Sequence, residues 1–245
     1  MVISGWNKKY LEILHEFRYS EKLDMKSAVI LNSLLKKTVS NKIINNKIKG
    51  KTVFVIGSGP SLYLAIPVLK KFKKTVKIVA DSAIKPLVEN GIKPDIVVTD
   101  LDGDEDSLIK IGKTDAIFVV HAHGDNIHKL NFVENFKNCI GTTQSKSFKK
   151  IQNFGGFTDG DRAVFLANHF NAKKIILFGM DLGEKIGQYS QTKPVDRRIK
   201  LKKLRKAKYL LEWLSEKTKL ELFTTSKSIR GFKKISYREV DIIIT

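Results

Sequence analysis

Cysteine, proline and long apolar runs are scarce in this chain of 245 residues, which has one cysteine and five prolines. The single thiol, Cys139, excludes an intramolecular disulfide framework and suits a reducing compartment. No apolar run approaches the roughly 20 residues that a membrane-spanning helix needs. The residues after Met1, VISGWNKKYLEIL, also lack the apolar core and the cleavage site of a signal peptide. We therefore expect a cytoplasmic protein with no membrane partner.

Acidic residues are also few: 25 Asp and Glu stand against 45 Lys and Arg, so the formal net charge is +20. Such an excess can indicate a nucleic-acid-binding protein. Most of the lysines are scattered singly or in pairs, however, which favours solvated surfaces, and we expect no nucleic-acid partner. The exception is DRRIKLKKLRKAK (196–208), with eight basic residues in thirteen. Its apolar positions recur at near-helical spacing and predict a basic amphipathic helix that either holds polyphosphate or faces water.

Short β-branched runs alternate with stretches of helical length along most of the chain. The predicted strands cover residues 52–57, 76–80, 95–99, 116–121, 138–141 and 174–179. This alternation predicts an α/β fold with a mostly parallel, doubly wound sheet. Residues 1–48 carry helical patterning and little strand signal. We therefore divide the chain into an N-terminal helical segment (1–48) and an α/β domain (49–245).

A polar cluster follows each of the six predicted strands. In chain order these clusters are GSGPS (57–61), Asp81 with Ser82, DLDGD (100–104), HAHGDN (121–126), GTTQS (141–145) and GMDLG (179–183). The carboxyl ends of parallel strands lie at one edge of the sheet, where open α/β proteins bind their ligands. Six clusters in succession therefore predict a binding site at that edge.

The turn GSGPS (57–61) is the first candidate for ligand binding. Its glycines allow backbone N–H groups to approach a phosphate, and the following helix N-terminus favours negative charge. The turn matches neither the P-loop pattern nor a complete G-x-G-x-x-G dinucleotide fingerprint. The structural alternative is a tight turn that places Ser61 near a helix start. The residues that we predict to bind nucleotide are Gly57, Ser58, Gly59, Pro60, Ser61, Asp81 and Ser82.

The stretch DLDGDED (100–106) is the most acidic part of this basic chain, with five acidic residues in seven. An EF-hand loop is excluded, because Glu105 and Ile111 stand where that loop needs glycine and glutamate. A Mg²⁺ site for a polyphosphate fits better, since hard cations bind carboxylate oxygens and phosphates together. Its predicted ligands are Asp100, Asp102 and Asp104. The structural alternative is a solvated turn in which Asp104 caps a helix.

The same stretch, VVTDLDG, also resembles haloacid-dehalogenase-type phosphatases. That resemblance implies Asp100 as the nucleophile and Asp102 as the acid/base. The family expects Thr or Val at the position of Asp104, and its first motif usually follows the first strand rather than the third. The phosphatase interpretation is therefore kept only as an alternative.

Two further clusters hold candidate catalytic groups. In HAHGDN, His121 and His123 are two residues apart on an extended segment and point the same way, but no cysteine or helical histidine pair joins them in a zinc site. We predict that one of them contacts phosphate or moves a proton, and that Asp125 adds a metal oxygen. In GGFTDGDRA (155–163), the alternative to a functional role is helix capping by Thr158 or Asp159. The residues that we predict to be catalytic are His123, Asp125, Asp161 (which would join the metal) and Arg162 (which would hold phosphate).

Taken together, GSGPSL, DIVVTDLDGD, HAHGDN, GFTDGDRA and GMDLG resemble, in order and spacing, the archaeal-type 6-hydroxymethyl-7,8-dihydropterin pyrophosphokinases. The resemblance runs from about Lys51 to the C-terminus, so the α/β domain is the catalytic one. It implies Mg²⁺-dependent transfer of diphosphate from ATP to a reduced pterin alcohol, with release of AMP, in archaeal pterin cofactor biosynthesis. The expected partners are therefore small molecules, ATP and the pterin, and self-association into a homo-oligomer is compatible with the sequence.

More distant resemblances keep the alternatives open. DGDEDS (102–107) is similar to the acidic metal motif of thiamine pyrophosphokinases, which supports diphosphate transfer. The GSGPSL turn also resembles that of flagellin-modifying glycosyltransferases in the same superfamily. A nucleotide-sugar glycosyltransferase is therefore the main alternative to the pyrophosphokinase.

Overall fold

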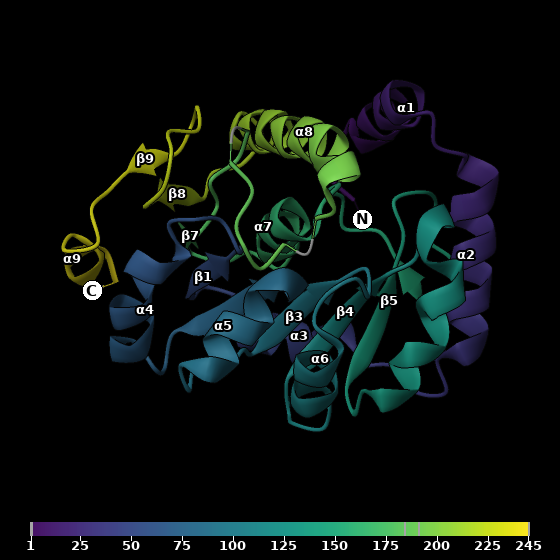
Figure 1. The fold of residues 1–245 in the computed structure, drawn as a ribbon, viewed down its shortest axis with the longest axis horizontal. Helices are drawn as coiled ribbons and strands as arrows, with labels where there is room; N and C mark the ends of the chain where they lie inside the picture. The colour runs from purple at the N-terminus through teal and green to yellow at the C-terminus, as the bar shows by residue number, and fades with distance from the viewer. Residues whose placement is uncertain (1, 184, 191, 245) are drawn as a thin grey trace.

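The structure is a computed structural model that describes residues 2–183, 185–190 and 192–244. Within these residues, nine parallel strands form one sheet in the order β6-β5-β4-β3-β2-β1-β7-β8-β9 (Figure 1). The strands are β1 (Thr52–Ile56), β2 (Val76–Ala80), β3 (Ile96–Thr99), β4 (Ile117–His121), β5 (Cys139–Thr142), β6 (Ile151–Gln152), β7 (Lys174–Phe178), β8 (Glu221–Thr224) and β9 (Lys233–Lys234). The predicted α/β class and parallel, doubly wound sheet are confirmed.

Strand order reverses next to β1. The chain builds the sheet outward from β1 to β6 and then returns to place β7 on the other side of β1. These two strands pair in parallel, with Val55 opposite Leu177 and Ile56 opposite Phe178. Loops that leave such neighbours in opposite directions open a crevice at the carboxyl ends of the strands. The topology therefore brings the turns at 57–61 and 179–183 together.

Helices cover both faces of the sheet. In Figure 1, α7 lies on one face with α8 outside it, while α4, α5 and α6 cover the other face. The helices are α1 (Trp6–Phe17), α2 (Glu21–Leu34), α3 (Asn41–Ile48), α4 (Leu62–Lys71), α5 (Ile84–Glu89), α6 (Glu105–Gly112), α7 (Asp159–His169), α8 (Arg197–Ser215) and α9 (Val240–Ile244), with the 3-10 segments η1 (Asp81–Ala83), η2 (Gly124–Asn135) and η3 (Pro194–Asp196). Among the described residues, no helix combines the length and apolarity needed to cross a bilayer.

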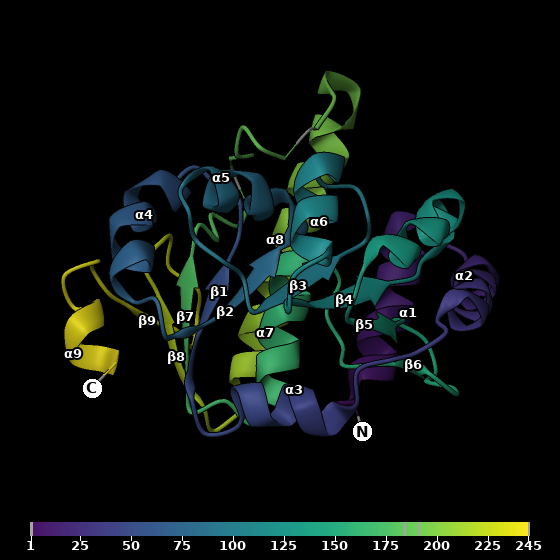
Figure 2. The ribbon, with the colours of Figure 1, turned by 90° about the horizontal axis from the view of Figure 1, so that it is seen from below.

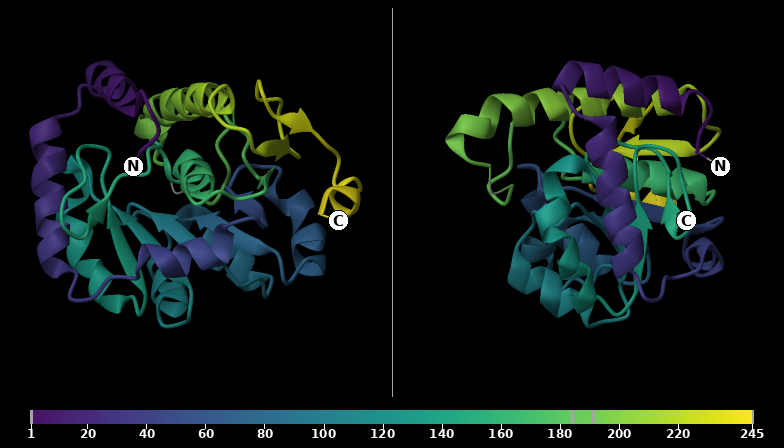
Figure 3. Two further views of the ribbon diagram at one scale, coloured as in Figure 1. Left: turned by 180° about the vertical axis from the view of Figure 1, so that it is seen from behind. Right: turned by 90° about the vertical axis from the view of Figure 1, so that its right-hand side faces the viewer.

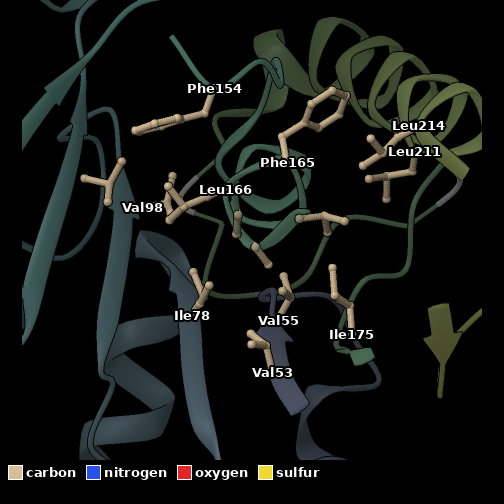
Figure 4. Packing of buried hydrophobic residues seen from close by; sticks show 14 of the residues in the cluster. Val53, Val55, Ile78, Val98, Phe154, Phe165, Leu166, Ile175, Leu211 and Leu214 are labelled. Carbon is tan, nitrogen blue, oxygen red and sulfur yellow. The ribbon is translucent and has the colours of Figure 1, made fainter. Parts of the chain in front are cut away.

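Successive side chains along each strand pack into two separate hydrophobic cores, one on each face of the sheet. Val53 and Val55 of β1 belong to the core under α7 and α8, whereas Phe54 and Ile56 belong to the core on the opposite face. This follows from the two-residue period of a strand whose two faces are both covered. Figure 4 shows the first core, where valines of β1 and β3 lie below Phe165 of α7 and the leucines of α8. The sheet is thus a rigid base for the loops at its edge.

The basic helix predicted from the sequence is α8. Its buried residues are Ala207, Leu210, Leu211 and Leu214, all in its second half. Its first turns project past the carboxyl edge of the sheet (Figure 2). The helix therefore buries its apolar half on α7 and extends its basic half over the edge where the polar clusters end.

The N-terminal helices pack into the same cores as the sheet. Trp6 and Tyr10 of α1 are buried beside Phe165, and the Trp6 indole N–H donates a hydrogen bond of 2.9 Å to the Gln144 carbonyl. The second helix, α2, stands along the β5 side of the sheet (Figure 3). The aromatic side chains of α1 are therefore core residues, and the domain boundary after residue 48 stays a prediction.

Cys139 opens β5 and is buried, with its backbone paired to Phe118 of β4. Burial raises the pKa of its thiol to about 12. The thiol is therefore protonated at neutral pH and serves as an apolar core side chain.

Candidate functional site

The glycine turn after β1 is tied to the turn after β7. The Gly57 N–H donates to the Phe178 carbonyl (2.9 Å), and the Gly59 N–H donates to the Gly179 carbonyl (2.8 Å). A Cβ atom on Gly59 would lie 2.4 Å from an Asp181 carboxylate oxygen, so only glycine permits this approach. Two donors that sequence analysis offered to a phosphate therefore hold the turn itself together.

Asp181 caps the helix that follows the glycine turn. Its Oδ2 accepts hydrogen bonds from the backbone N–H and the hydroxyl of Ser61, both at 2.8 Å. A carboxylate at a helix N-terminus satisfies an unpaired N–H group and complements the helix dipole. The GMDLG motif thus fixes the start of α4. What remains open toward solvent is the Ser58 hydroxyl, which lies 2.8 Å from the Ser82 hydroxyl, with both serines lining the cleft described below.

Four aspartates converge beside these serines and form what we call the acidic cluster. Its members are Asp81, Asp100, Asp102 and Asp159, and each offers an oxygen that lies within 4.8 Å of the others. They come from the carboxyl ends of β2 and β3 and from the first residue of α7. The ends of two consecutive, paired strands and the start of one helix thus bring four carboxylates together.

Mutual repulsion controls the ionisation of the acidic cluster. The charge of Asp81, then burial and the charge of Asp100, raise the pKa of Asp102 to about 9. Burial, and next the neighbouring carboxylates, also raise the pKa values of Asp81 and Asp159. Burial acts in the same direction on Asp100, but favourable interactions, led by the hydrogen bond from His123, outweigh it and hold the pKa of Asp100 well below the usual range. The cluster therefore retains protons unless a cation binds.

The acidic cluster suits a hard divalent cation. Carboxylate oxygens are the ligands that Mg²⁺ and Ca²⁺ take. The Oδ1 atom of Asp100 is buried and has no hydrogen-bond partner in the part of the chain that the structure describes. A buried oxygen left without a donor is costly, and a bound cation would relieve that cost. The donor set and this orphaned oxygen both fit a metal.

Asp104 lies outside the acidic cluster, although sequence analysis grouped it with the metal ligands. It is the N-cap of α6, where its Oδ2 accepts from the Ser107 N–H (3.1 Å) and hydroxyl (2.6 Å). Its other oxygen pairs with Lys85 Nζ at 3.1 Å. The chain enters a helix directly after Gly103, so the helix start takes this carboxylate, as the alternative interpretation held. Asp159, which sequence analysis considered only as a cap, lies in the cluster instead.

Asp161 and Arg162 lie beneath the cluster rather than in the cleft. The Asp161 carboxylate accepts from the Phe157 N–H (2.8 Å) and from the N–H (2.7 Å) and hydroxyl (2.6 Å) of Thr158. Arg162, which is 2% exposed, donates to the carbonyls of Gly156 (3.1 Å) and Phe157 (2.9 Å). These bonds hold the loop that presents Asp159, although Arg162 Nε is buried with no partner in the described part of the chain. Neither side chain lines the cleft, where a metal ligand or a phosphate contact was predicted.

The two histidines of HAHGDN have different surroundings. His121 is buried between Thr142 and Gln144, and burial lowers the pKa of its imidazole well below 6.5. His123 Nε2 lies 3.4 Å from an Asp100 oxygen, while its Nδ1 accepts the Asp125 N–H at 3.3 Å. A ring that accepts at Nδ1 carries its proton at Nε2. His123 therefore orients a member of the acidic cluster, and His121 belongs to the core.

A cleft that is open to solvent contains the acidic cluster. The glycine turn and residues 179–182 form one wall, and the start of α7 forms another. Lys200 and Lys203 of α8 face the carboxylates across it. Burial alone lowers the pKa of Lys203, but Tyr19 and the carboxylates of Asp100 and Asp125 raise it overall. The basic run singled out in the sequence thus supplies two cations to the site, although the sequence did not indicate which two.

Comparison with known proteins identifies a family and several relatives of this chain. The family model described as 6-hydroxymethylpterin diphosphokinase MptE-like matches residues 30–187. A Methanocaldococcus jannaschii protein named 6-hydroxymethyl-7,8-dihydropterin pyrophosphokinase is 42% identical, with 90% of this chain and 99% of that protein aligned. Proteins of the same name from Pyrococcus furiosus and Methanothermobacter thermautotrophicus are 42% and 37% identical, over 90% and 87% of this chain and 97% and 95% of their own.

A solved structure, the MAf glycosyltransferase from Magnetospirillum magneticum AMB-1, shares the fold. Its TM-score is 0.55 at 17% identity, over 89% of this chain and 38% of that chain. Similarity at this level concerns the fold alone. The family model and the three relatives, by contrast, span most of the sequence, and this chain belongs to the MptE-like 6-hydroxymethylpterin diphosphokinase family.

Proposed function

We propose that this protein transfers diphosphate from ATP to 6-hydroxymethyl-7,8-dihydropterin and releases AMP, in the synthesis of a tetrahydromethanopterin-type cofactor. The observation that carries the proposal is the acidic cluster at the switch point of the sheet, facing Lys200 and Lys203 across one cleft. The names of the three relatives supply the reaction and the pterin. The geometry supplies a place for a cation and for the negative charge of a polyphosphate.

In this reaction the hydroxymethyl oxygen of the pterin bonds to the β-phosphorus of ATP. The bond from that phosphorus to the oxygen bridging the α- and β-phosphates breaks, AMP leaves with the electron pair, and the hydroxyl proton is released. Catalysis of phosphoryl-group transfer depends mainly on alignment and on neutralisation of charge. When bound, Mg²⁺ supplies that neutralisation at the phosphate oxygens.

Different residues of the chain would bind the metal and neutralise the phosphate charge. Asp81, Asp100, Asp102 and Asp159 would hold the metal, with Asp100 oriented by His123. Lys200 and Lys203 would balance phosphate charge from the opposite wall. Asp161 and Arg162 would act indirectly: their hydrogen bonds hold the loop that positions Asp159.

The nucleotide would lie on the glycine-turn side of the cleft. The hydroxyls of Ser58 and Ser82 face this space and can bond ribose or phosphate oxygens. Gly187 passes so close to the Ser58 carbonyl that a Cβ atom on it would lie 1.7 Å away, so residues 185–190 form a cover over the turn. We place the reaction in the cytoplasm, where ATP and a reduced thiol such as Cys139 coexist.

The test is an incubation of the purified protein with ATP, Mg²⁺ and 6-hydroxymethyl-7,8-dihydropterin, with chromatographic separation of the nucleotides and pterins. We expect AMP and pterin diphosphate in equal amounts. Formation of ADP would indicate transfer of a single phosphoryl group instead. If the folded protein turns over no nucleotide with any divalent metal, the proposal fails and a nucleotide-sugar donor becomes the substrate to test.

A further inference from the structure

A second cavity adjoins the cleft on the side of the N-terminal helices. We call it the outer compartment, and its own lining includes Tyr19, Asp125, Lys129, Ile199 and Asp196. It shares Ser82, Asp102, Ser190, Lys200 and Lys203 with the cleft. The two cavities therefore meet at the acidic cluster and at the two lysines of α8. A reaction between two substrates needs this arrangement, with one substrate on each side of the reacting phosphate.

We propose that the outer compartment binds the pterin and that the Asp125 carboxylate holds its pyrimidine edge. This inference rests on the proposed function and adds the location and the recognition group of the second substrate. It also gives the N-terminal segment a role, because Tyr19, between α1 and α2, forms part of the wall.

The Asp125 carboxylate is available for a ligand. Its side chain is 64% exposed, and its Oδ2 lies 3.9 Å from His123 Nδ1. Within residues 2–183, 185–190 and 192–244, the Asp125 carboxylate accepts no hydrogen bond from the protein. The Asp161 and Asp181 carboxylates, by contrast, accept hydrogen bonds from backbone N–H groups. A carboxylate at the wall of a cavity with no protein donor is suited to accept from a bound molecule.

The chemistry of a reduced pterin matches this compartment. Its pyrimidine ring presents a ring N–H and an amino group side by side, and a carboxylate accepts such a pair as it accepts the two N–H groups of a guanidinium. The ring of Tyr19 and the side chain of Ile199 supply apolar walls for a flat bicycle. The nucleotide is assigned to the cleft instead, because the glycine turn and the Ser58 hydroxyl line the cleft and not the outer compartment.

The spacing also agrees with the reaction. One imidazole separates Asp125 from the acidic cluster, since His123 lies 3.9 Å from an Asp125 oxygen and 3.4 Å from an Asp100 oxygen. A bicycle anchored by its pyrimidine edge at Asp125 extends its opposite end, which carries the hydroxymethyl group, toward Asp102. Asp102 lines both cavities, so the attacking oxygen meets the β-phosphate where the compartments join.

The test compares Asp125→Asn with Asp115→Asn, a matched control that removes an exposed carboxylate lining neither cavity. Loss of a charge-assisted hydrogen-bonded pair should raise the KM for the pterin by about tenfold or more in Asp125→Asn. The KM for ATP should stay at the wild-type value, and Asp115→Asn should match the wild type for both substrates. Binding of 6-hydroxymethylpterin without ATP, followed by its fluorescence, should weaken by the same factor in Asp125→Asn alone.

Three outcomes would overturn the inference: an unchanged pterin affinity in Asp125→Asn, an increase in the KM for ATP in place of the KM for the pterin, or an equal loss in Asp115→Asn. Thermal unfolding checks that both variants are folded, which we expect because Asp125 is exposed. Failure of the proposed function is distinguishable, because the wild type itself would then neither bind nor convert the pterin.

Discussion

Two sets of carboxylates in this protein differ in what surrounds them. Asp161 is buried, and its two oxygens receive three hydrogen bonds from Phe157 and Thr158. The acidic cluster stands just above it, and there carboxylates face one another while Asp100 Oδ1 has no donor at all in the described chain. The first arrangement stabilises a loop, and the second carries unrelieved repulsion. Asp81 of the cluster also accepts from the Thr99 hydroxyl (2.9 Å), so the functional set is distinguished by the facing carboxylates and the donorless Asp100 oxygen rather than by a lack of all hydrogen bonds.

The strongest test of this difference is Asp102→Asn. If Asp102 holds the metal that neutralises the polyphosphate, AMP formation should fall at least about 100-fold. The metal-free protein should be no less stable than the wild type, because the raised pKa of Asp102 keeps its side chain largely protonated at neutral pH and asparagine then replaces an uncharged carboxyl group. Turnover assays and thermal unfolding in EDTA measure the two effects. Activity near the wild-type level would remove the acidic cluster from the mechanism.

Asp161→Asn should reduce the stability of the protein more than Asp102→Asn does. The substitution places an amide against the Phe157 and Thr158 donors, so we expect a loss of about 2–3 kcal/mol in the free energy of unfolding. Urea denaturation measures it, with Asp102→Asn as the matched control. A variant as stable as the wild type would show that the three hydrogen bonds do not hold the loop.

The pH dependence of stability should report the state of the acidic cluster. The folded-state pKa values of Asp81, Asp102 and Asp159 are raised, so the folded protein binds more protons than the unfolded chain. The free energy of unfolding should then fall as pH rises from the ordinary carboxyl value of 3.8 toward the value of about 9 for Asp102. Saturating Mg²⁺ should flatten this slope. Equal slopes in Mg²⁺ and in EDTA would argue against a metal at this site.

The smallest effect is expected at Asp104. Asparagine is as good an N-cap as aspartate, so Asp104→Asn should change the free energy of unfolding by less than about 0.5 kcal/mol. Activity should stay within about twofold of the wild type, since surface substitutions away from a site are nearly neutral. Because Asp102 and Asp104 are two residues apart, the pair of variants tests whether these two aspartates have different roles. A large loss of activity in Asp104→Asn would return it to the metal ligands.

Most of the fold follows from local patterns in the sequence. The central strands are continuous β-branched runs, and each ends in a polar cluster, so the edge that holds the site was also predictable. The strands β6 and β9 have two residues each, and no pattern can mark so short an element. Their place depends on pairing with the neighbouring strand rather than on their own side chains.

The site was predictable by motif and less so by residue. In TDGD (158–161), Asp159 and Asp161 carry the same chemistry, and only the path of the loop into α7 decides which one reaches the cluster and which one caps the helix. The same holds for Lys200 and Lys203, which reach the cleft because of where α8 crosses the sheet edge. These assignments depend on packing between segments distant in the sequence, and no local pattern records that packing.

The rate at which the buried thiol at the start of β5 reacts can report how often this part of the sheet opens. Cys139 is the only cysteine, and its side chain is buried in the core on one face of the sheet. Its raised pKa keeps it unreactive until that region opens, since the thiolate is the nucleophile. The half-life of thiol labelling in the native protein therefore measures how often the region around β5 opens. The protein thus carries its own single-site probe of internal motion, far from the glycine turn and free of any engineered residue.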